Sequence, residues 1–218
     1  MTPARDLRVL KLRALASLHR LRRSAAIACT AAPGLPERIT ISYCTIELLN
    51  LWSAFTRSYF LSCILRPRRV QGGRVTCTAT VASFTDAITL AISKHKPHLL
   101  NRPRPPGATW HRRDEPPWHD PAILRKGCVD LGCSHALDVQ AALALPTRVF
   151  DDLPVFRNYF GHRNGQTESA AKSRARLYLI NTSLHPTAML AARPAGRPYP
   201  LLVDWTNDLE VIIGLLCD

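Results

Sequence analysis

An arginine and a histidine within one short aromatic segment are the residues of this sequence best suited to chemistry. The segment runs Phe156-Arg157-Asn158-Tyr159-Phe160-Gly161-His162-Arg163-Asn164. Arginine carries a planar, permanently charged fork of donors that suits phosphate oxygens, and histidine titrates near neutral pH and can transfer a proton. Such a pair can cleave RNA without a metal, because one group stabilises the phosphate charge and the other acts as acid or base at the 2′-hydroxyl or the leaving oxygen.

The context of Arg157 and His162 separates them from other arginine and histidine pairs of similar spacing. The amide Asn158 follows the arginine, aromatic residues lie between the pair, and apolar residues precede it. The pairs that end at His111 and His119 lie in proline-rich sequence, which cannot hold a regular helix. We therefore treat Arg157, Asn158 and His162 as the candidate catalytic residues.

The stretch from Arg157 to His162 resembles the R-x4-6-H motif of the HEPN superfamily, whose active members are endoribonucleases. The resemblance implies an all-α, HEPN-like helical bundle that dimerises and forms a composite cleft where the two subunits meet. In that cleft His162 would act as general acid or base and Arg157 would stabilise the phosphorane. Asn158 would orient the histidine or the phosphate, and Arg163 and Tyr159 would support substrate binding.

The same residues also have a purely structural interpretation. Arg157 can pair with an acid such as Asp151 or Glu47, while His162 caps a helix C-terminus, where the helix dipole favours an imidazolium. A single regular helix would also place Arg157 and His162 about 140° apart around its axis. Either the helix ends at Gly161 and lets the histidine turn, or two copies pool their residues.

Helical periodicity runs through most of the chain and alternation with a period of two is almost absent, so the sequence predicts an all-α fold. Leu7, Leu10, Ala14, Leu18 and Leu21 form the apolar stripe of the first helix. The predicted helices cover Ala4 to Ala28, Thr40 to Leu65, Val81 to Ser93, Pro121 to Leu131, Ser134 to Leu145, Asp151 to Arg163, Glu168 to Asn181 and Leu202 to Leu216.

The second predicted helix is the most apolar and carries one polar stripe, formed by Glu47, Asn50, Ala54 and Arg57. These residues fall within an arc of about 80°. A polar stripe on an apolar helix requires partners. Either Glu47 and Arg57 pair through Asn50 or the stripe lies at the bundle surface, or else it faces Arg157 and His162 and orients them.

Length and charge favour one domain with a polyanionic partner. The chain has 218 residues, is 46% hydrophobic and carries a net charge of +13, mostly from arginine. We expect a single domain, residues 1–218, that binds RNA, although a basic surface can also serve solubility alone or reflect base composition. A DNA-associated protein is a third reading, for which no recognition-helix signature is present.

Two segments rich in arginine are predicted to be irregular. An insertion at about residues 94–120 combines proline, arginine and histidine with Trp110 and Trp118. It either clamps single-stranded RNA by stacking or is an ordered loop with its tryptophans packed on the bundle. The basic turn from Arg66 to Arg74 either approaches a phosphate or is a solvated loop.

The seven cysteines are odd in number and scattered, which favours reduced thiols in the cytoplasm. Cys128, Cys133 and His135, with His111 and His119 upstream, resemble a set of zinc ligands. Their spacing, however, matches no usual ligand knuckle, so no metal is expected.

No apolar run approaches the roughly 20 residues of a membrane-spanning helix, so no membrane contact is expected. The arginine-rich N-terminus also fits a transit peptide, but its long regular stripe favours an ordinary first helix.

From these observations we expect a metal-independent, cofactor-free endoribonuclease that leaves a 2′,3′-cyclic phosphate. We expect the protein to be a cytoplasmic homodimer that acts as a toxin or antiphage effector and has an antitoxin or other regulatory partner. The alternative is a non-catalytic RNA-binding or protein-assembly module of the same fold.

Overall fold

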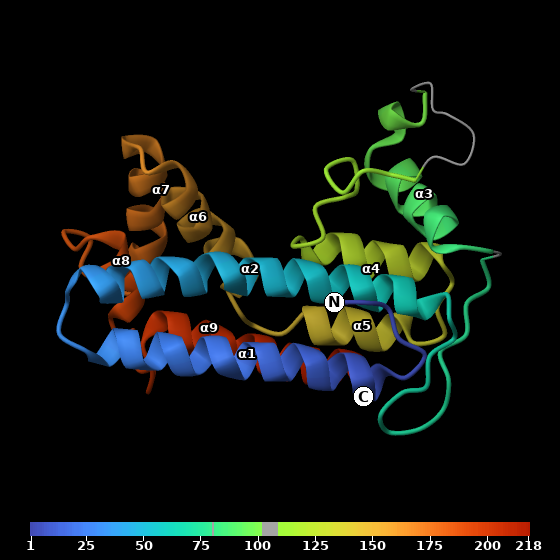
Figure 1. The fold of residues 1–218 in the computed structure, drawn as a ribbon, viewed down its shortest axis with the longest axis horizontal. Helices are drawn as coiled ribbons and strands as arrows, with labels where there is room; N and C mark the ends of the chain where they lie inside the picture. Colours follow the sequence, from blue (N-terminus) through green and yellow to red (C-terminus); the bar gives the residue numbers. More distant parts are fainter. Residues whose placement is uncertain (80, 102–108) are drawn as a thin grey trace. The chain divides into compact units, whose positions relative to one another are not determined.

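The computed structural model describes residues 1–79, 81–101 and 109–218, and the regular secondary structure of these residues is helical. Within these ranges the chain forms nine α-helices and one short 3-10 helix, and it forms no strand beyond three isolated bridges (Figure 1). The predicted all-α class is confirmed. The helices are α1 Leu7–Thr30, α2 Leu35–Cys63, α3 Phe84–His95, η1 Pro97–Leu99, α4 Pro121–Asp130, α5 Ala136–Leu143, α6 Val149–His162, α7 Gly165–Arg176, α8 Pro186–Ala191 and α9 Leu201–Cys217.

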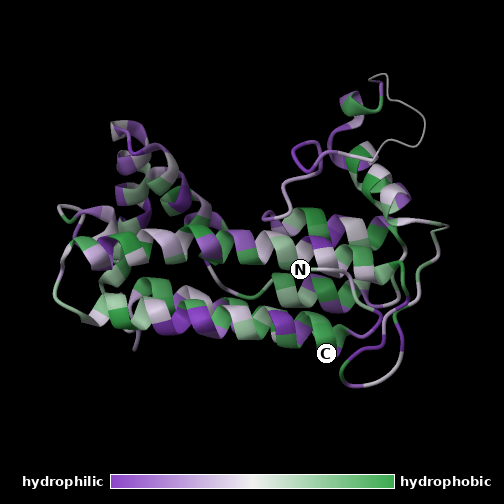
Figure 2. Ribbon diagram, viewed as in Figure 1, coloured by the Kyte–Doolittle hydropathy of each residue, from purple (hydrophilic) through white to green (hydrophobic). Residues whose placement is uncertain are grey.

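The predicted helices correspond to eight of these elements, with ends that differ by a few residues. The predicted stripe of α1 is buried at Leu7, Leu10, Ala14 and Leu18, whereas Leu21 is half-buried. Figure 2 shows hydrophobic and hydrophilic residues interleaved along this helix, as a helix with one buried side requires. The short helix α8 was not predicted, because six residues are too few to establish a period.

The chain divides into two compact units, each assembled from separate segments. Unit 1 contains residues 1–14, 52–145 and 212–218, and unit 2 contains residues 15–51 and 146–211. The three long helices α1, α2 and α9 contribute residues to each unit. The prediction of one domain stays a prediction.

Unit 1 has a core of aromatic side chains from the second half of α2. Phe55, Tyr59 and Phe60 are fully buried there, and α4 packs against both α3 and α5. The described part of the predicted insertion is an ordered loop whose tryptophans pack on helices. The Trp118 ring lies 5.2 Å from the Phe60 ring, and Trp110 Nε1 donates to Thr89 Oγ1 at 2.8 Å. Residues 102–108 of the insertion, with Arg104, lie outside the described residues.

Unit 2 contains the hairpin of α6 and α7, with α8 packed on α7. Phe156 of α6 meets Trp205 of α9 edge to face, with ring centroids 5.6 Å apart. Arg22 of α1 donates to Glu210 of α9 at 2.5 Å, and Glu210 also contacts His19 at 2.8 Å. These contacts join α1, α6, α7 and α9 within the unit that carries the predicted catalytic motif.

None of the described helices is long and apolar enough to cross a membrane.

Candidate functional site

The motif helix α6 begins and ends differently from the prediction. Its first residue is Val149 and its cap position is Arg148, so Pro154 lies inside the helix rather than in its first turn. Its last helical residue is His162, and Arg163 follows in the left-handed conformation with φ of 48°. The Arg163 amide donates to the Tyr159 carbonyl at 2.7 Å and so closes the helix. Gly161 therefore does not end α6, and His162 stays in register with the preceding turn.

Arg157 and Asn158 lie at the surface of the last turns of α6. Arg157 is half-buried and its Nη1 is 3.5 Å from Asn158 Oδ1. A side chain placed on Gly161 would have its first carbon 3.6 Å from the same Nη1, so the guanidinium lies against the residue that precedes His162. No ion pair with an acid is found for Arg157 in the described part of the chain. Its charge is therefore available to a ligand.

His162 and Arg163 are exposed at the C-terminal end of α6. On a continuous helix, His162 lies about 140° around the axis from Arg157. The guanidinium extends toward the C-terminal end of the helix and lies beside Gly161. The motif is thus an open, solvent-facing arrangement of a cation, an amide and an imidazole.

Tyr159 of α6 and Arg163, the residue that follows the helix, line a pocket of about 210 Å³. Arg38 and Ser42 of α2 and His185 line the pocket with them. Thr187 also lines it, so two guanidinium groups and four further polar side chains form a site suited to an anionic or polar ligand. The whole pocket belongs to unit 2.

Hydrogen bonds fix the proton on His185. Its Nδ1 accepts from the Thr187 amide at 3.3 Å, and its Nε2 lies 3.0 Å from Tyr159 Oη. Because a backbone amide only donates, Nδ1 is the unprotonated nitrogen and Nε2 donates to Tyr159. The hydroxyl proton of Tyr159 is then free for another acceptor. Burial raises the pKa of Tyr159, whereas burial and the charge of Arg38 lower the pKa of His185, so both shifts favour the uncharged forms of the two side chains.

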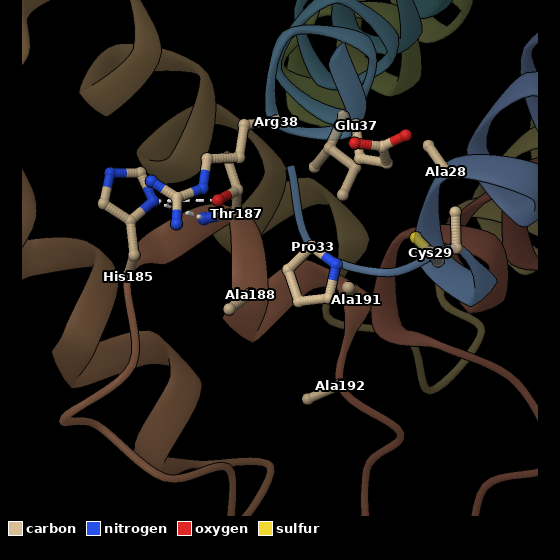
Figure 3. A pocket seen from close by; sticks show the side chains of 12 residues that line it. Ala28, Cys29, Pro33, Glu37, Arg38, His185, Thr187, Ala188, Ala191 and Ala192 are labelled. Carbon is tan, nitrogen blue, oxygen red and sulfur yellow. Dashed lines mark hydrogen bonds between the residues drawn. The ribbon is translucent and has the colours of Figure 1, made fainter. Parts of the chain in front are cut away.

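A second pocket, of about 320 Å³, shares Arg38, His185 and Thr187 with the first. Figure 3 shows these three side chains together, with Cys29 and several alanines around the remainder of the pocket. The lining is otherwise mostly apolar, from the end of α1 to α8. A polar compartment thus adjoins an apolar one.

The polar stripe of α2 is divided between the two units. Asn50 Nδ2 donates to Glu47 Oε1 at 3.0 Å in unit 2, whereas Arg57 belongs to unit 1. Arg57 forms a bidentate ion pair with the buried Glu115, at 2.6 and 2.7 Å. Its carboxylate partner is therefore Glu115 and not Glu47. Neither Glu47 nor Asn50 is found in a hydrogen bond with the described side chains of the motif.

No pattern in the sequence predicted that a carboxylate on α6 would be buried and bound by other side chains. Asp152 is fully buried and accepts from Arg148 Nε at 3.1 Å and Tyr178 Oη at 2.7 Å. Arg174 Nη1 lies 3.4 Å from its other oxygen. Burial and the hydrogen bond to Asp152 raise the pKa of Tyr178. This network joins α6 to α7, and Asp152 Oδ1 is buried without a hydrogen bond among the described residues, with Arg174 as its nearest cation.

Neither His185 nor Arg38 was predicted as a site residue, and only His185 lies in a recognisable sequence pattern. The order His185-Pro186-Thr187 is typical of a helix start, because proline suits the first turn and a polar side chain can cap it. His185 does accept from the Thr187 amide. Its contact with Tyr159 spans 26 residues and no local pattern predicts it.

Comparisons of the chain with protein-family models, with curated proteins and with solved structures find no match.

Proposed function

We propose that this protein is a metal-independent endoribonuclease of the HEPN type, with Arg157, Asn158 and His162 as its catalytic residues. The observation that supports this most directly is the end of α6, where an exposed imidazole, an amide and an arginine that has no acidic partner among the described residues lie within six residues. These groups match the requirements of 2′-hydroxyl attack on a phosphodiester.

In the proposed reaction His162 removes the proton from a ribose 2′-hydroxyl. The O2′ atom then attacks the adjacent phosphorus, and the bond from phosphorus to the 5′-oxygen breaks. Arg157 stabilises the charge on the phosphorane, and Asn158 orients the histidine or the phosphate. The leaving oxygen takes a proton from an imidazolium, and the products are a 2′,3′-cyclic phosphate and a 5′-hydroxyl. DNA lacks the attacking group and is not cleaved.

The pocket beside the motif supplies a binding site for the nucleotide next to the cleaved bond. Arg38 and Arg163 would bind a phosphate, and the free hydroxyl proton of Tyr159 would add a donor. Arg163 follows His162 directly in the sequence, so a phosphate bound by Arg163 would lie near the proposed acid or base.

A second copy of the chain would complete the site. The separation of about 140° between Arg157 and His162 on one helix favours pairing the arginine of one chain with the histidine of another. Leu35, Ile39 and Tyr43 of α2 are spaced four residues apart and are 70%, 58% and 58% exposed. Since Leu35 and Ile39 also line the polar pocket, this apolar stripe is a surface on which two copies can meet beside the motif.

The test is RNA cleavage in EDTA by the full chain and by His162→Ala and Arg157→Ala. We expect cleavage of RNA but not of DNA, a cyclic phosphate product, and loss of cleavage in each variant with circular dichroism unchanged. Arg176→Ala and His98→Ala, which remove exposed side chains of the same types, are the matched controls. Cleavage that requires an added divalent ion, or that survives in His162→Ala, contradicts the proposal.

Mixing the two inactive variants tests the shared site. If Arg157 of one chain works with His162 of the other, a mixed dimer contains one intact site and regains part of the activity. If both residues act from the same chain, the mixture stays inactive. Ile39→Glu should weaken dimerisation, measured by light scattering, and should reduce RNA cleavage to the same extent.

The alternative function is a non-catalytic RNA-binding or assembly module, which the net charge of +13 also fits. In that case His162→Ala leaves RNA binding intact, whereas charge reversal in the basic turn from Arg66 to Arg74 abolishes it. A role as a toxin would add growth arrest on expression of the wild-type chain and relief of the arrest by His162→Ala.

A further inference from the structure

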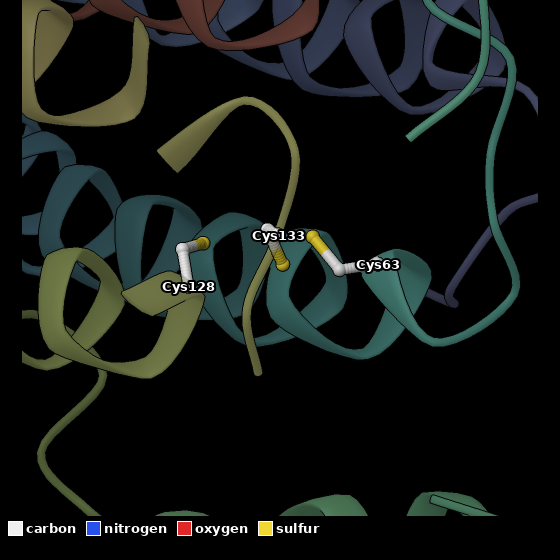
Figure 4. Close-up of side chains that lie close together, drawn as sticks. All are labelled: Cys63, Cys128 and Cys133. Carbon is white, nitrogen blue, oxygen red and sulfur yellow. The ribbon is translucent and has the colours of Figure 1, made fainter. Parts of the chain in front are cut away.

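Four cysteines from three separate segments come together in unit 1. Cys63 ends α2, Cys77 lies in the following loop, Cys128 lies in α4 and Cys133 follows α4. The sulfur atoms of Cys63, Cys128 and Cys133 all lie within 4.8 Å of one another (Figure 4). The Cys77 sulfur is 3.3 Å from that of Cys133.

The backbone, rather than the thiols, holds this cysteine cluster in place. The Cys133 amide donates to the Cys128 carbonyl at 2.9 Å, which closes the turn after α4. An isolated antiparallel bridge pairs Cys77 with Cys133. On either side of the bridge, Ser134 N donates to Thr76 O at 2.9 Å and Thr78 N to Gly132 O at 3.3 Å.

A glycine permits the close approach of these two segments. Gly132 has φ of +61°, and a side chain there would have its first carbon 1.9 Å from Thr78 Oγ1. Any other residue at this position would clash with the Thr78 side chain. Glycine at position 132 therefore allows Cys77 to lie beside Cys133.

The cluster is enclosed. Cys63 and Cys128 are fully buried and Cys133 is 6% exposed, while Cys77 lies at its half-buried edge. Structural zinc sites are closed sites of this kind, with four thiolates at about 2.3 Å from the ion and hence sulfur atoms about 3.8 Å apart. The three buried sulfur atoms lie within 4.8 Å of one another, and Cys77, which is outside that group, has its sulfur 3.3 Å from Cys133 Sγ. The half-buried Cys77 therefore moves closer to the other cysteines when it completes a tetrahedral site.

We propose that Cys63, Cys77, Cys128 and Cys133 bind one structural zinc ion. Binding converts four thiols and Zn²⁺ into a tetrathiolate complex of charge −2 and releases four protons, with no redox step. Arg66, whose charge acts on Cys77, partly offsets that negative charge. The bound ion ties the end of α2 to the turn after α4 and to the loop between them.

This ligand set differs from the one that the sequence suggested. His135 Nε2 lies 2.7 Å from Tyr59 Oη, which donates to the Leu216 carbonyl at 2.6 Å, so the ring is held by the phenol and not by the cluster. Its place is taken by Cys63 and Cys77, which lie 65 and 51 residues before Cys128. A spacing of that length carries no local signature, and the fold alone brings these residues together.

The test measures the metal content of the full chain purified under reducing conditions without chelator. We expect about one zinc per chain by elemental analysis and native mass spectrometry. Replacement by Co²⁺ should give the intense sulfur charge-transfer and tetrahedral d–d bands of a tetrathiolate site. Cys133→Ser should lose most of the zinc, and Cys44→Ser, a buried cysteine of unit 2, should keep it.

Cys77→Ser covers the case in which Cys133→Ser does not fold, because Cys77 lies at the edge of the cluster. This variant should still bind Co²⁺, with fewer sulfur ligands and a weaker charge-transfer band. Wild-type protein without zinc, or with a disulfide between Cys77 and Cys133 in its place, overturns the proposal. Neither readout depends on RNA cleavage, and the buried ion is separate from the chemistry proposed at α6.

Discussion

Arg57 and Glu115 form a bidentate ion pair in which Nε and Nη2 of the guanidinium donate to the two carboxylate oxygens at 2.6 and 2.7 Å. Glu115 is 3% exposed, and Trp118 Nε1 also donates to it at 2.7 Å. The pair fixes the described end of the insertion to α2. A residue that the sequence suggested as support for catalysis is thus occupied in holding a loop.

Arg57→Ala should destabilise the protein by about 3 kcal/mol, because it leaves a buried carboxylate without its cation. The measurement is urea unfolding followed by circular dichroism. Arg112→Ala is the matched control. The Arg112 side chain is 54% exposed and comes no closer than 4.0 Å to Glu115, so its loss should change the unfolding free energy by no more than about 0.5 kcal/mol. If Arg57→Ala retained its stability and lost RNA cleavage, Arg57 would belong to the catalytic site after all.

Tyr178→Phe should cost about 1 to 2 kcal/mol of unfolding free energy, because one hydroxyl serves two buried partners. It donates to Asp152 at 2.7 Å and accepts from Trp205 Nε1 at 3.2 Å. Tyr43→Phe removes the same atom from a side chain that is 58% exposed and should change little. Equal effects of the two substitutions in urea unfolding would exclude a structural role for the Asp152 network.

The helices could be predicted from the sequence because their apolar residues recur at helical spacing over many turns. In α9, for example, Trp205, Leu209, Ile212, Ile213 and Leu216 recur at helical spacing and are all buried. The start of α6 was misplaced because Asp151 and Asp152 are typical cap residues, whereas Asp152 is drawn inward by Tyr178. Tertiary hydrogen bonds overrode the local preference there.

The candidate site could be predicted only as far as it is local. Arg157, Asn158 and His162 belong to one helix, so their spacing in the sequence describes their arrangement. The pocket beside them joins Arg38 of α2 to His185 before α8, and no pattern relates residues so far apart. The cysteine cluster shows the same limit, because Cys63 and Cys133 come from different elements.

Gly132→Ala should destabilise the protein more than Gly196→Ala does. The two glycines have similar positive φ values, +61° and +74°, so alanine costs about 1 kcal/mol of backbone strain at each. Only Gly132 has a neighbour in the way, Thr78 Oγ1 at 1.9 Å, while nothing lies within 4 Å at Gly196. Thermal unfolding of the two variants measures the difference, and equal stability would mean that the 76–79 loop does not pack on the turn.

His185 should titrate below its ordinary value of 6.5, and the shift should report on the pocket. Burial contributes most, the charge of Arg38 adds to it, and Glu168 opposes it. Arg38→Gln should therefore raise the pKa measured by NMR, and Glu168→Gln should lower it further. Because the folded pKa is depressed, the unfolded chain takes up the proton first, and this histidine reduces stability as the pH falls below 6.5.

The same titration tests whether the pocket binds phosphate. An anion between Arg38 and Arg163 would offset the charges that depress the pKa of His185, so inorganic phosphate or a nucleoside monophosphate should move the midpoint upward. Chloride at equal ionic strength is the control for screening. Arg163→Gln should reduce the response to phosphate. An equal shift with both salts would mean that the pocket does not bind the anion, and RNA binding would then depend on α6 without it.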